Sequence, residues 1–245
     1  MSANGFLRPD WPAPVTIHAA TTLRWGGFST GSFHSLNLAQ HVGDDVEQVR
    51  QNRHCLRQLL SLPSEPVWLQ QEHSAICVNA ADVSGVVVAD ASFSLQPNVV
   101  CAVMTADCLP VLLCSCDGSR VAAVHAGWRG LVNGVISNTV KALATRELLA
   151  WLGPAIGPQC FEVGDEVRNA FLHKSNDYDA AFHLGVAPGK WLADIYRLAS
   201  IELTHLGVKA IHGGGFCTMT DEENFFSYRR DHKTGRMVSL IWREQ

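Results

Sequence analysis

Three residues of the sequence carry the side chains of a zinc-type ligand set: His73, Cys108 and His125. Two imidazoles and one thiolate leave a fourth coordination position open, which is the arrangement of catalytic zinc sites. Their separations along the chain are far wider than the Cys-x-x-Cys spacing of zinc fingers, so spacing alone favours a buried cysteine and two hydrogen-bonded histidines in a core. A metal centre is one alternative, and a Cys108 nucleophile with a histidine base is another.

Each of these three residues follows or ends a short apolar segment that is predicted to form a strand, over 67–69, 99–104 and 120–124 respectively. Asp117-Gly118 is typical of a tight hairpin turn, so the segments 110–114 and 120–124 are expected to pair. The loop after His125 leads into a predicted helix over about 131–143. Such strand ends are where α/β proteins place chemistry, so we expect the three side chains to converge at one edge of a sheet.

Further elements are predicted around this centre. A first helix, capped by Asp44, ends before Pro63, and two more helices are expected over 162–172 and about 191–206. A closing strand is expected over 237–242. Helices and strands alternate but hairpins are also present, which favours a mixed sheet covered by helices over a purely parallel barrel.

The composition indicates a protein with a large core. Of the 245 residues, 47% are hydrophobic and only 17% are charged, which excludes a disordered chain or a coiled coil. The formal net charge of −4 provides no basic field for a phosphate backbone, so nucleic acid is not an expected partner. No linker or repeat divides the sequence, and we expect one domain over residues 1–245.

The cysteines and the apolar segments indicate where the chain works. Asp107 interrupts the best membrane candidate, which runs over 99–114, so we expect no membrane partner. The N-terminal segment has no basic region followed by an apolar stretch, and the eight cysteines do not suit a secreted disulfide framework in a chain of this length. We therefore expect a cytoplasmic protein with reduced thiols.

Two motifs stand out in the sequence: TADCLPV at 105–111 and VHAGWRGL at 124–131. They resemble the signature motifs of the laccase-domain family, whose members are also called YfiH-like or peptidoglycan-editing-factor proteins. Further segments match the family in order along nearly the whole chain: RWGG at 24–27, SLNL at 35–38, HVGD at 41–44, QEH at 71–73, LGPAIGP at 152–158, FEVG at 161–164, FSYRRD at 226–231 and TGR at 234–236. One departure is that Glu72 and Ser74 flank His73 where the family often has Val and Gly.

This resemblance implies a fold, a cofactor and an activity. The fold is an α/β (α+β) layered α-β-β-α sandwich with mixed sheets, which the family shares with a cysteine deamidase toxin. Zinc is held by the positions matching His73, Cys108 and His125. The substrates are purine nucleosides and phosphate: adenosine, inosine, guanosine and methylthioadenosine are cleaved by phosphorolysis, and adenosine is deaminated. A role in editing peptidoglycan precursors is also implied. A monomer or a homodimer is expected.

Residues within the segments that match the family are candidates for catalysis. Besides its role as a metal ligand, Cys108 is the candidate nucleophile. His41 can exchange a proton, and the guanidinium of Arg24 can bind phosphate or a ribose oxygen. Asp107 can shuttle a proton, or it can orient a ligand or cap a turn.

Four further residues are candidates for substrate binding. Asn37 can contact the ribose or close a turn. Arg129 precedes a predicted helix and can bind an anion or form a surface ion pair. Tyr228 and Arg229 can lie over a purine base by stacking and cation–π contact, or pack within a C-terminal loop.

Three other functions stay open at this point. A multicopper laccase needs His-x-His pairs and a cysteine flanked by histidine, and the eleven histidines and eight cysteines supply neither, although copper can bind the same thiolate and imidazoles. A cysteine amidohydrolase acting on cell-wall precursors would use Cys108 with His125 and no metal. A binding protein would need the ligands but no turnover.

Overall fold

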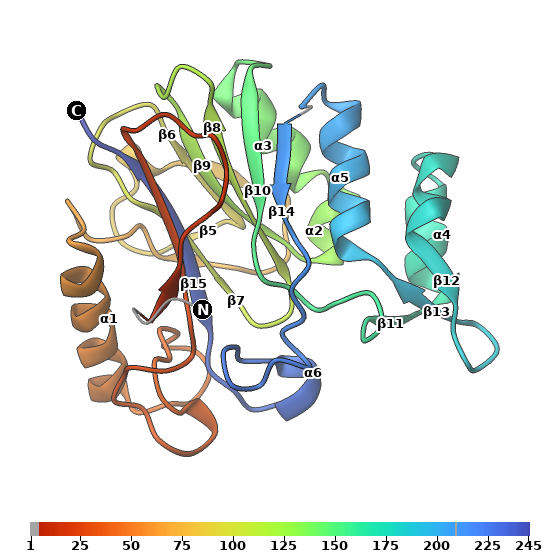
Figure 1. The fold of residues 1–245 in the computed structure, drawn as a ribbon, viewed down its shortest axis with the longest axis horizontal. Coiled ribbons are helices and arrows are strands. Elements are labelled where there is room, and N and C mark those ends of the chain that lie inside the picture. The colour runs from red at the N-terminus through yellow and green to blue at the C-terminus, as the bar shows by residue number, and fades with distance from the viewer. Residues whose placement is uncertain (1–4, 209) are drawn as a thin grey trace.

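Two β-sheets are stacked face to face at the centre of the molecule (Figure 1). The computed structural model describes residues 5–208 and 210–245, so the first four residues of the N-terminal segment lie outside the described residues. The larger sheet has the order β14 (Ala210–Gly213), β10 (Leu148–Leu152), β8 (Leu109–Ser115), β9 (Val121–Ala126), β6 (Ala91–Ser94) and β4 (Cys77–Asn79). The smaller has the order β1 (Phe6–Leu7), β2 (Ile17–Thr22), β15 (Met237–Arg243) and β7 (Cys101–Thr105).

Helices cover the outer faces of both sheets. The helix α1 (Val46–Leu60) packs through Leu56 on the four-stranded sheet, against Ala102, Val238 and Leu240. The helices α2 (Trp128–Asn133), α3 (Val135–Leu143) and α5 (Ile195–His205) cover the six-stranded sheet. Both sheets contribute to the core between them, including Val103, Leu112, Trp151 and Ile241. The expected α-β-β-α layering is therefore confirmed.

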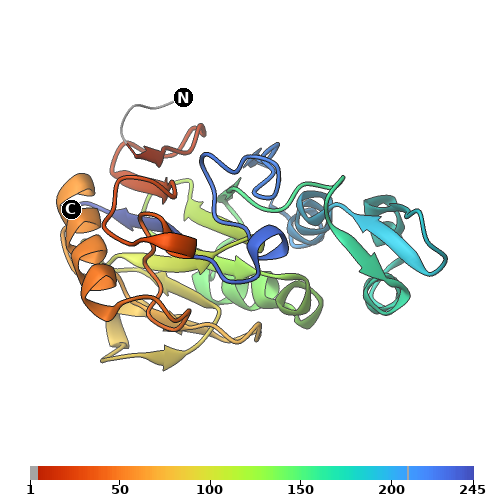
Figure 2. The ribbon, with the colours of Figure 1, turned by 90° about the horizontal axis from the view of Figure 1, so that it is seen from below.

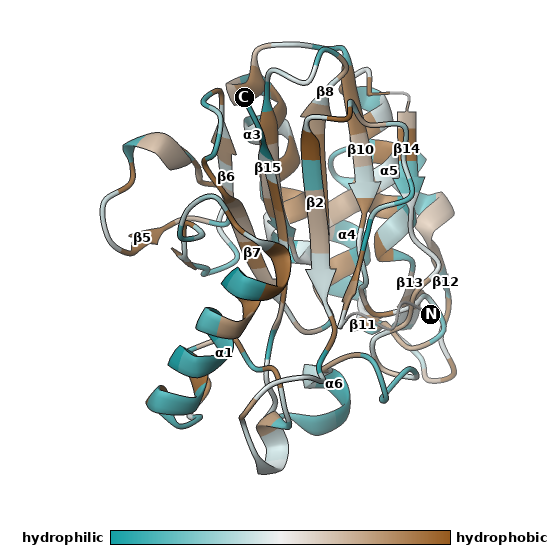
Figure 3. Ribbon diagram, turned by 60° about the vertical axis from the view of Figure 1, so that its left-hand side comes forward, coloured by the Kyte–Doolittle hydropathy of each residue, from teal (hydrophilic) through white to brown (hydrophobic). Residues whose placement is uncertain are grey.

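The six-stranded sheet is mixed, as expected. β10 pairs with β14 and β4 pairs with β6 in parallel, whereas β8 is antiparallel to both β9 and β10. Hydropathy follows the layering: the strands of both sheets are mostly hydrophobic, whereas α1 and α6 (Tyr228–Asp231) carry much polar surface (Figure 3). This pattern is what burial between layers requires.

A smaller unit projects from one side of the layers (Figure 2). It contains the three-stranded sheet of β11 (Glu162–Gly164), β13 (Lys190–Ala193) and β12 (Phe182–Leu184), with α4 (Asp165–Leu172) beside it. A two-stranded parallel sheet joins β3 (Leu69–Gln70) to β5 (Val87–Val88). Short 3-10 turns occupy Gly31–Phe33, Ala80–Asp82 and Asn176–Ala181.

Three predictions of local structure were wrong in detail. The helix expected over 131–143 is two helices, α2 and α3, because Gly134 adopts a left-handed φ of 88° between them. The starts of the helices expected over 162–172 and 191–206 are strands, β11 and β13, which pair with each other. Asp45 caps α1 in place of Asp44, since its carboxylate accepts the amides of Glu47 and Gln48.

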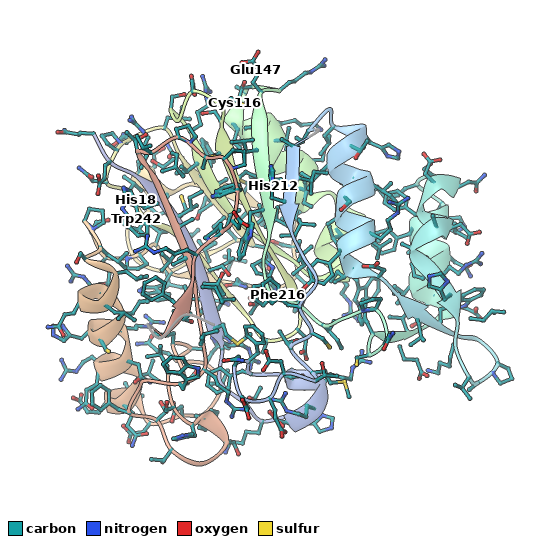
Figure 4. The ribbon with its side chains drawn as sticks, viewed as in Figure 1. His18, Cys116, Glu147, His212, Phe216 and Trp242 are labelled. Atoms are coloured by element: carbon teal, nitrogen blue, oxygen red, sulfur yellow. The ribbon has the colours of Figure 1, made fainter. Side chains whose placement is uncertain are left out.

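The predicted β8–β9 hairpin is confirmed, and its turn lies at the opposite end of β8 from the candidate site. Cys116 lies at the turn of this hairpin, where its amide donates to the carbonyl of Glu147 (Figure 4). Cys108 lies just before β8, at the opposite end of that strand. At the four-stranded sheet, His18 on β2 stacks on Trp242 on β15 with centroids 5.4 Å apart (Figure 4).

No helix in the described part of the chain is both long and apolar enough to cross a membrane.

Candidate metal centre and active site

His73, Cys108 and His125 meet at one end of the six-stranded sheet. One ligand atom from each lies within 4.8 Å of the other two, and the Cys108 sulfur is 3.6 Å from the Nε2 atom of His73. The two imidazole rings approach edge to face, with centroids 4.8 Å apart. These three residues were expected to converge at one edge of a sheet, and the structure brings them together.

The β8–β9 hairpin and the loop after β3 position this cluster. His125 is the penultimate residue of β9 and pairs with Pro110, so the hairpin register places it beside Cys108, which lies just before β8. His73 comes from the loop that follows β3 and adopts a left-handed φ of 61°. His125 is buried, while Cys108 and His73 are half-buried, so one side of the cluster faces a cavity.

One pair of donor atoms in the cluster already has the spacing that a tetrahedral metal ion requires. Bonds of about 2.05 Å to nitrogen and about 2.3 Å to sulfur, at a tetrahedral angle, separate the two donor atoms by about 3.6 Å. The sulfur-to-nitrogen distance between Cys108 and His73 has this value. Three protein ligands leave a fourth position that can face the cavity, as in catalytic zinc sites. The donor set is therefore compatible with metal binding.

Gly127 gives the cluster room. A Cβ atom at this position would lie 2.8 Å from the Cδ2 atom of His73 and 3.0 Å from the Cys108 sulfur. The backbone of Gly127 has an ordinary φ of −65°, so its conformation does not require glycine. The need for glycine at 127 thus comes from the approach of the two ligands.

The cluster is also electrostatically coupled. Burial alone would raise the pKa of Cys108, but His125 and His73 lower that pKa to about 6 through charge and hydrogen bonding. Burial opposes the charge of His125, yet the Cys108 thiolate and Asp90 raise the pKa of His125 to about 9. The cluster thus favours a thiolate, which is the form that binds metals and acts as a nucleophile.

Asp90 is a functional residue that sequence analysis missed. Its buried carboxylate lies 2.7 Å from the Nδ1 atom of His125, so the Nε2 atom of that ring is the one left for a ligand. Burial disfavours its charge, but hydrogen bonds from His125 and Ser74 lower the pKa of Asp90 to about 2. A single aspartate after an apolar run carries no local signal, because its partners come from other segments of the chain.

A cavity of about 530 Å³ opens over the cluster. Its lining includes most of the predicted site residues: His41, Asp107, Arg129, Tyr228 and Arg229, together with the three candidate ligands. Phe161, Ile156 and Ile195 supply apolar surface, and Arg236 supplies a further cation that was not among the predicted site residues. The cavity thus combines apolar and basic walls above a ligand cluster, as expected for a small-molecule site.

Asp107 is fixed by two hydrogen bonds. Its carboxylate accepts the hydroxyl of Thr218 at 2.6 Å and the amide of Arg229 at 2.6 Å. The backbone of Asp107 has a left-handed φ of 93°. These contacts tie the Cys108 loop to the segment that carries Tyr228 and Arg229.

Two predicted site residues do not line the cavity. The guanidinium of Arg24 donates to the carbonyls of His34 and Glu222, at 3.2 and 2.8 Å, and lies over the ring of Phe226. The buried amide of Asn37 bonds to Ala39 and Asp44 and accepts the amide of Arg236. The polar groups of both side chains are thus used to join loops of the protein.

The sequence matches the family model described as multi-copper polyphenol oxidoreductase laccase over residues 18–244. A purine nucleoside phosphorylase of Pseudomonas aeruginosa is 53% identical over 241 residues, covering 98% of each chain. The purine nucleoside phosphorylase YfiH of Escherichia coli K12 is 50% identical, covering 96% of this chain and 97% of its own.

Solved structures agree with these sequence matches. A Neisseria meningitidis protein assigned to the family model DUF152 superposes with a TM-score of 0.95 at 49% identity, over 98% of this chain and 100% of its own. YlmD from Geobacillus stearothermophilus superposes with a TM-score of 0.91 at 31% identity, over 100% of this chain and 98% of its own.

Proposed function

The chain belongs to the family described as multi-copper polyphenol oxidoreductase laccase, and from this membership we propose that it is a zinc-dependent purine nucleoside phosphorylase. The observation that carries the proposal is the His73, Cys108 and His125 cluster at the base of a cavity with apolar and basic walls. The relatives named purine nucleoside phosphorylase cover nearly the whole chain and support an enzyme of that type.

In phosphorolysis, a phosphate oxygen forms a bond to C1′ of the ribose while the bond from C1′ to the purine nitrogen breaks. The bonding electrons leave with the purine, which takes up a proton, and the products are ribose 1-phosphate and the free base. The protein must therefore hold the anion, orient the nucleoside and supply that proton. His73, Cys108 and His125 would hold a zinc ion, which would supply Lewis acidity.

We assign phosphate binding to Arg236 instead of Arg24. The Nη1 atom of Arg236 donates to the carbonyls of Thr234 and Gly235, while its Nε and Nη2 atoms have no hydrogen bond within the described residues. Burial lowers the pKa of Arg236 and the charges of Cys108 and Asp107 raise it, which puts this guanidinium close to the ligand cluster. Its free N–H groups suit the fork geometry of an oxyanion.

We assign the other cavity residues to purine binding or to proton transfer. Phe161, Ile156 and Tyr228 offer apolar and aromatic surface for a purine, and Arg229 lies over Phe161 at 5.7 Å. His41 lines the same cavity, and burial and Arg236 lower its pKa, so this imidazole is held in its neutral form and can take up a proton and pass it on. Arg129, over the ring of Trp128, is a second cation at the cavity wall.

The first test is metal content together with phosphate-dependent release of hypoxanthine from inosine. We expect about one zinc per chain, lost in Cys108→Ala and in His73→Ala or His125→Ala, because two ligands rarely hold zinc. Full metal retention in Cys108→Ala would overturn the proposed centre. Copper at the same ligands is the alternative, and metal analysis of unsupplemented protein separates the two.

The second test compares Arg236→Ala with Arg24→Ala. We expect Arg236→Ala to lower phosphate-dependent cleavage by about 2 kcal/mol, or about 30-fold, with a raised KM for phosphate. Arg24→Ala is the matched control, and we expect it to leave the KM for phosphate unchanged. An unchanged KM for phosphate in Arg236→Ala would contradict this assignment and favour Arg129 as the phosphate-binding residue.

The proposal extends to adenosine, guanosine and methylthioadenosine as substrates and to adenosine deamination, in which water replaces the amino group at C6. Because deamination needs no phosphate, Arg236→Ala should raise the ratio of inosine formed from adenosine to hypoxanthine released from inosine. Editing of peptidoglycan precursors is a further role that a precursor-binding assay would test. We also propose a cytoplasmic enzyme with one domain over 1–245, as a monomer or homodimer; its eight free cysteines suit a reducing compartment.

One observation favours a second candidate, a cysteine amidohydrolase. Asp90, His125 and Cys108 form a connected series of a carboxylate, an imidazole and a thiolate, which is the order of groups in a cysteine nucleophile site. Alkylation of Cys108 distinguishes the phosphorylase from the amidohydrolase. Under the phosphorylase proposal, zinc protects Cys108 from alkylation, whereas fast labelling of this thiol in zinc-replete protein would favour the amidohydrolase.

A further inference from the structure

The buried carboxylate of Asp90 contacts the segments of both candidate histidine ligands. Its Oδ1 atom accepts the backbone amide of His73 at 3.0 Å and lies 2.7 Å from the Nδ1 atom of His125. Its Oδ2 atom accepts the amides of Ser74 at 2.6 Å and Glu72 at 3.3 Å. Asp90 is fully buried in the short connection between β5 and β6.

The three amides of residues 72–74 surround one carboxylate. Successive backbone N–H groups that point inward form a concave anion site, and here the anion is a side chain of the protein. His73 in this segment has a φ of 61°, a left-handed conformation that is uncommon for a residue other than glycine. The hydrogen bonds to Asp90 compensate for this conformation, which directs the His73 side chain toward Cys108.

The same carboxylate determines which nitrogen of His125 is free. A carboxylate can only accept a hydrogen bond, so the Nδ1 atom of His125 must carry a hydrogen to donate to it. The Nε2 atom then offers its lone pair to a metal. The backbone reinforces this contact, since the amide of His125 donates to the carbonyl of Asp90 at 2.7 Å. Asp90 is thus held against His125 by its main chain as well as by its side chain.

We propose that Asp90 is a positioning residue that sets both histidine ligands at once, by holding the His73 loop and by fixing the His125 tautomer. This inference rests on the proposed metal centre. It assigns Asp90 no contact with substrate; the residue acts through the ligands.

The test is Asp90→Asn, with zinc affinity measured by competition against a chromophoric chelator. Asparagine has one oxygen, so its amide nitrogen must face either the amides of Glu72 and Ser74 or the amide of His73 and the Nδ1 atom of His125. In the first orientation the His73 loop loses an acceptor, and in the second the amide nitrogen donates to Nδ1 and drives His125 toward the tautomer with hydrogen on Nε2, which cannot coordinate through that atom. We expect zinc affinity to fall about 10-fold to 100-fold.

Asp117→Asn is the matched control. Asp117 also accepts a backbone amide, that of Ser119, and hydrogen bonds likewise lower its pKa to about 2, but it lies at the far end of the β8–β9 hairpin. We expect its zinc affinity to equal that of the unsubstituted protein. Unfolding of both metal-free variants is measured as well, since a purely structural role for Asp90 would reduce stability and leave the zinc affinity of the folded protein intact.

A measurement on the unsubstituted protein keeps the proposal testable if Asp90→Asn does not fold. In zinc-loaded protein labelled with ¹⁵N-histidine, we expect coordination through Nε2 of His125 and a slowly exchanging hydrogen on Nδ1. Coordination through Nδ1, or unchanged zinc affinity in folded Asp90→Asn, would overturn the inference alone. Absence of zinc binding by the unsubstituted protein would overturn the metal centre and this inference with it.

Discussion

At the scale of single residues, the candidate centre depends on space as much as on ligand chemistry. Gly127 passes so close to His73 and Cys108 that an added methyl group would overlap both. Ligand residues can be proposed from their types, but a glycine whose role is to leave room is recognised only when its neighbours are known.

We therefore predict that Gly127→Ala lowers zinc affinity and phosphorolysis at least 10-fold while the protein stays folded, because His73 and Cys108 must move apart from their tetrahedral spacing. Gly134→Ala makes a useful contrast. Its φ of 88° disfavours alanine, so it should cost about 1 kcal/mol of unfolding free energy and leave zinc affinity unchanged. Equal zinc affinity in Gly127→Ala and the unsubstituted protein would contradict this account.

At the scale of elements, helix α1 offers a clean test of capping. The carboxylate of Asp45 accepts the amides of Glu47 and Gln48 at 2.9 and 3.0 Å. We predict that Asp45→Ala lowers the free energy of unfolding by about 1 kcal/mol in urea denaturation, while Asp45→Ser retains most of it. A loss as large in Asp45→Ser as in Asp45→Ala would show that the charge, and not the cap, stabilises the helix.

Local patterns predicted some elements well and others poorly, for physical reasons. The β8–β9 hairpin was predictable because its turn residues and its two apolar strands act locally. Residues 191–193 were expected in a helix but belong to β13, since pairing with β11 and β12 overrides their weak local preference. Such pairing between distant segments has no signal in the strand's own sequence.

The candidate site divides in the same way. His73, Cys108 and His125 were found from residue type and family motifs, which do not depend on the exact fold. Arg24 and Asn37 matched the motifs equally well, but their polar groups join loops outside the cavity. Arg236 and Asp90 became candidates only through their three-dimensional neighbours, Cys108 and the two histidines.

At the scale of the whole molecule, the core between the two sheets should contribute strongly to stability. Leu112 is fully buried there, whereas Leu184 on β12 is 78% exposed. We predict that Leu112→Ala lowers the free energy of unfolding by about 2–5 kcal/mol, while Leu184→Ala changes it by less than about 0.5 kcal/mol. Urea denaturation of both variants is the measurement. Similar losses of unfolding free energy in the two variants would contradict the contribution of this core.

The place of β15 in the four-stranded sheet bears on how the protein matures during synthesis. This strand lies between β2 and β7, so these two strands cannot be joined in one sheet until β15 has been made. Arg236 immediately precedes β15, and Tyr228 and Arg229 lie shortly before it. A nascent chain still on the ribosome can therefore present the Cys108 thiolate and the two imidazoles before Arg229 and Arg236 of the basic wall have been made. For the proposed zinc enzyme, metal acquisition can thus precede catalytic competence, and the order of translation separates the two.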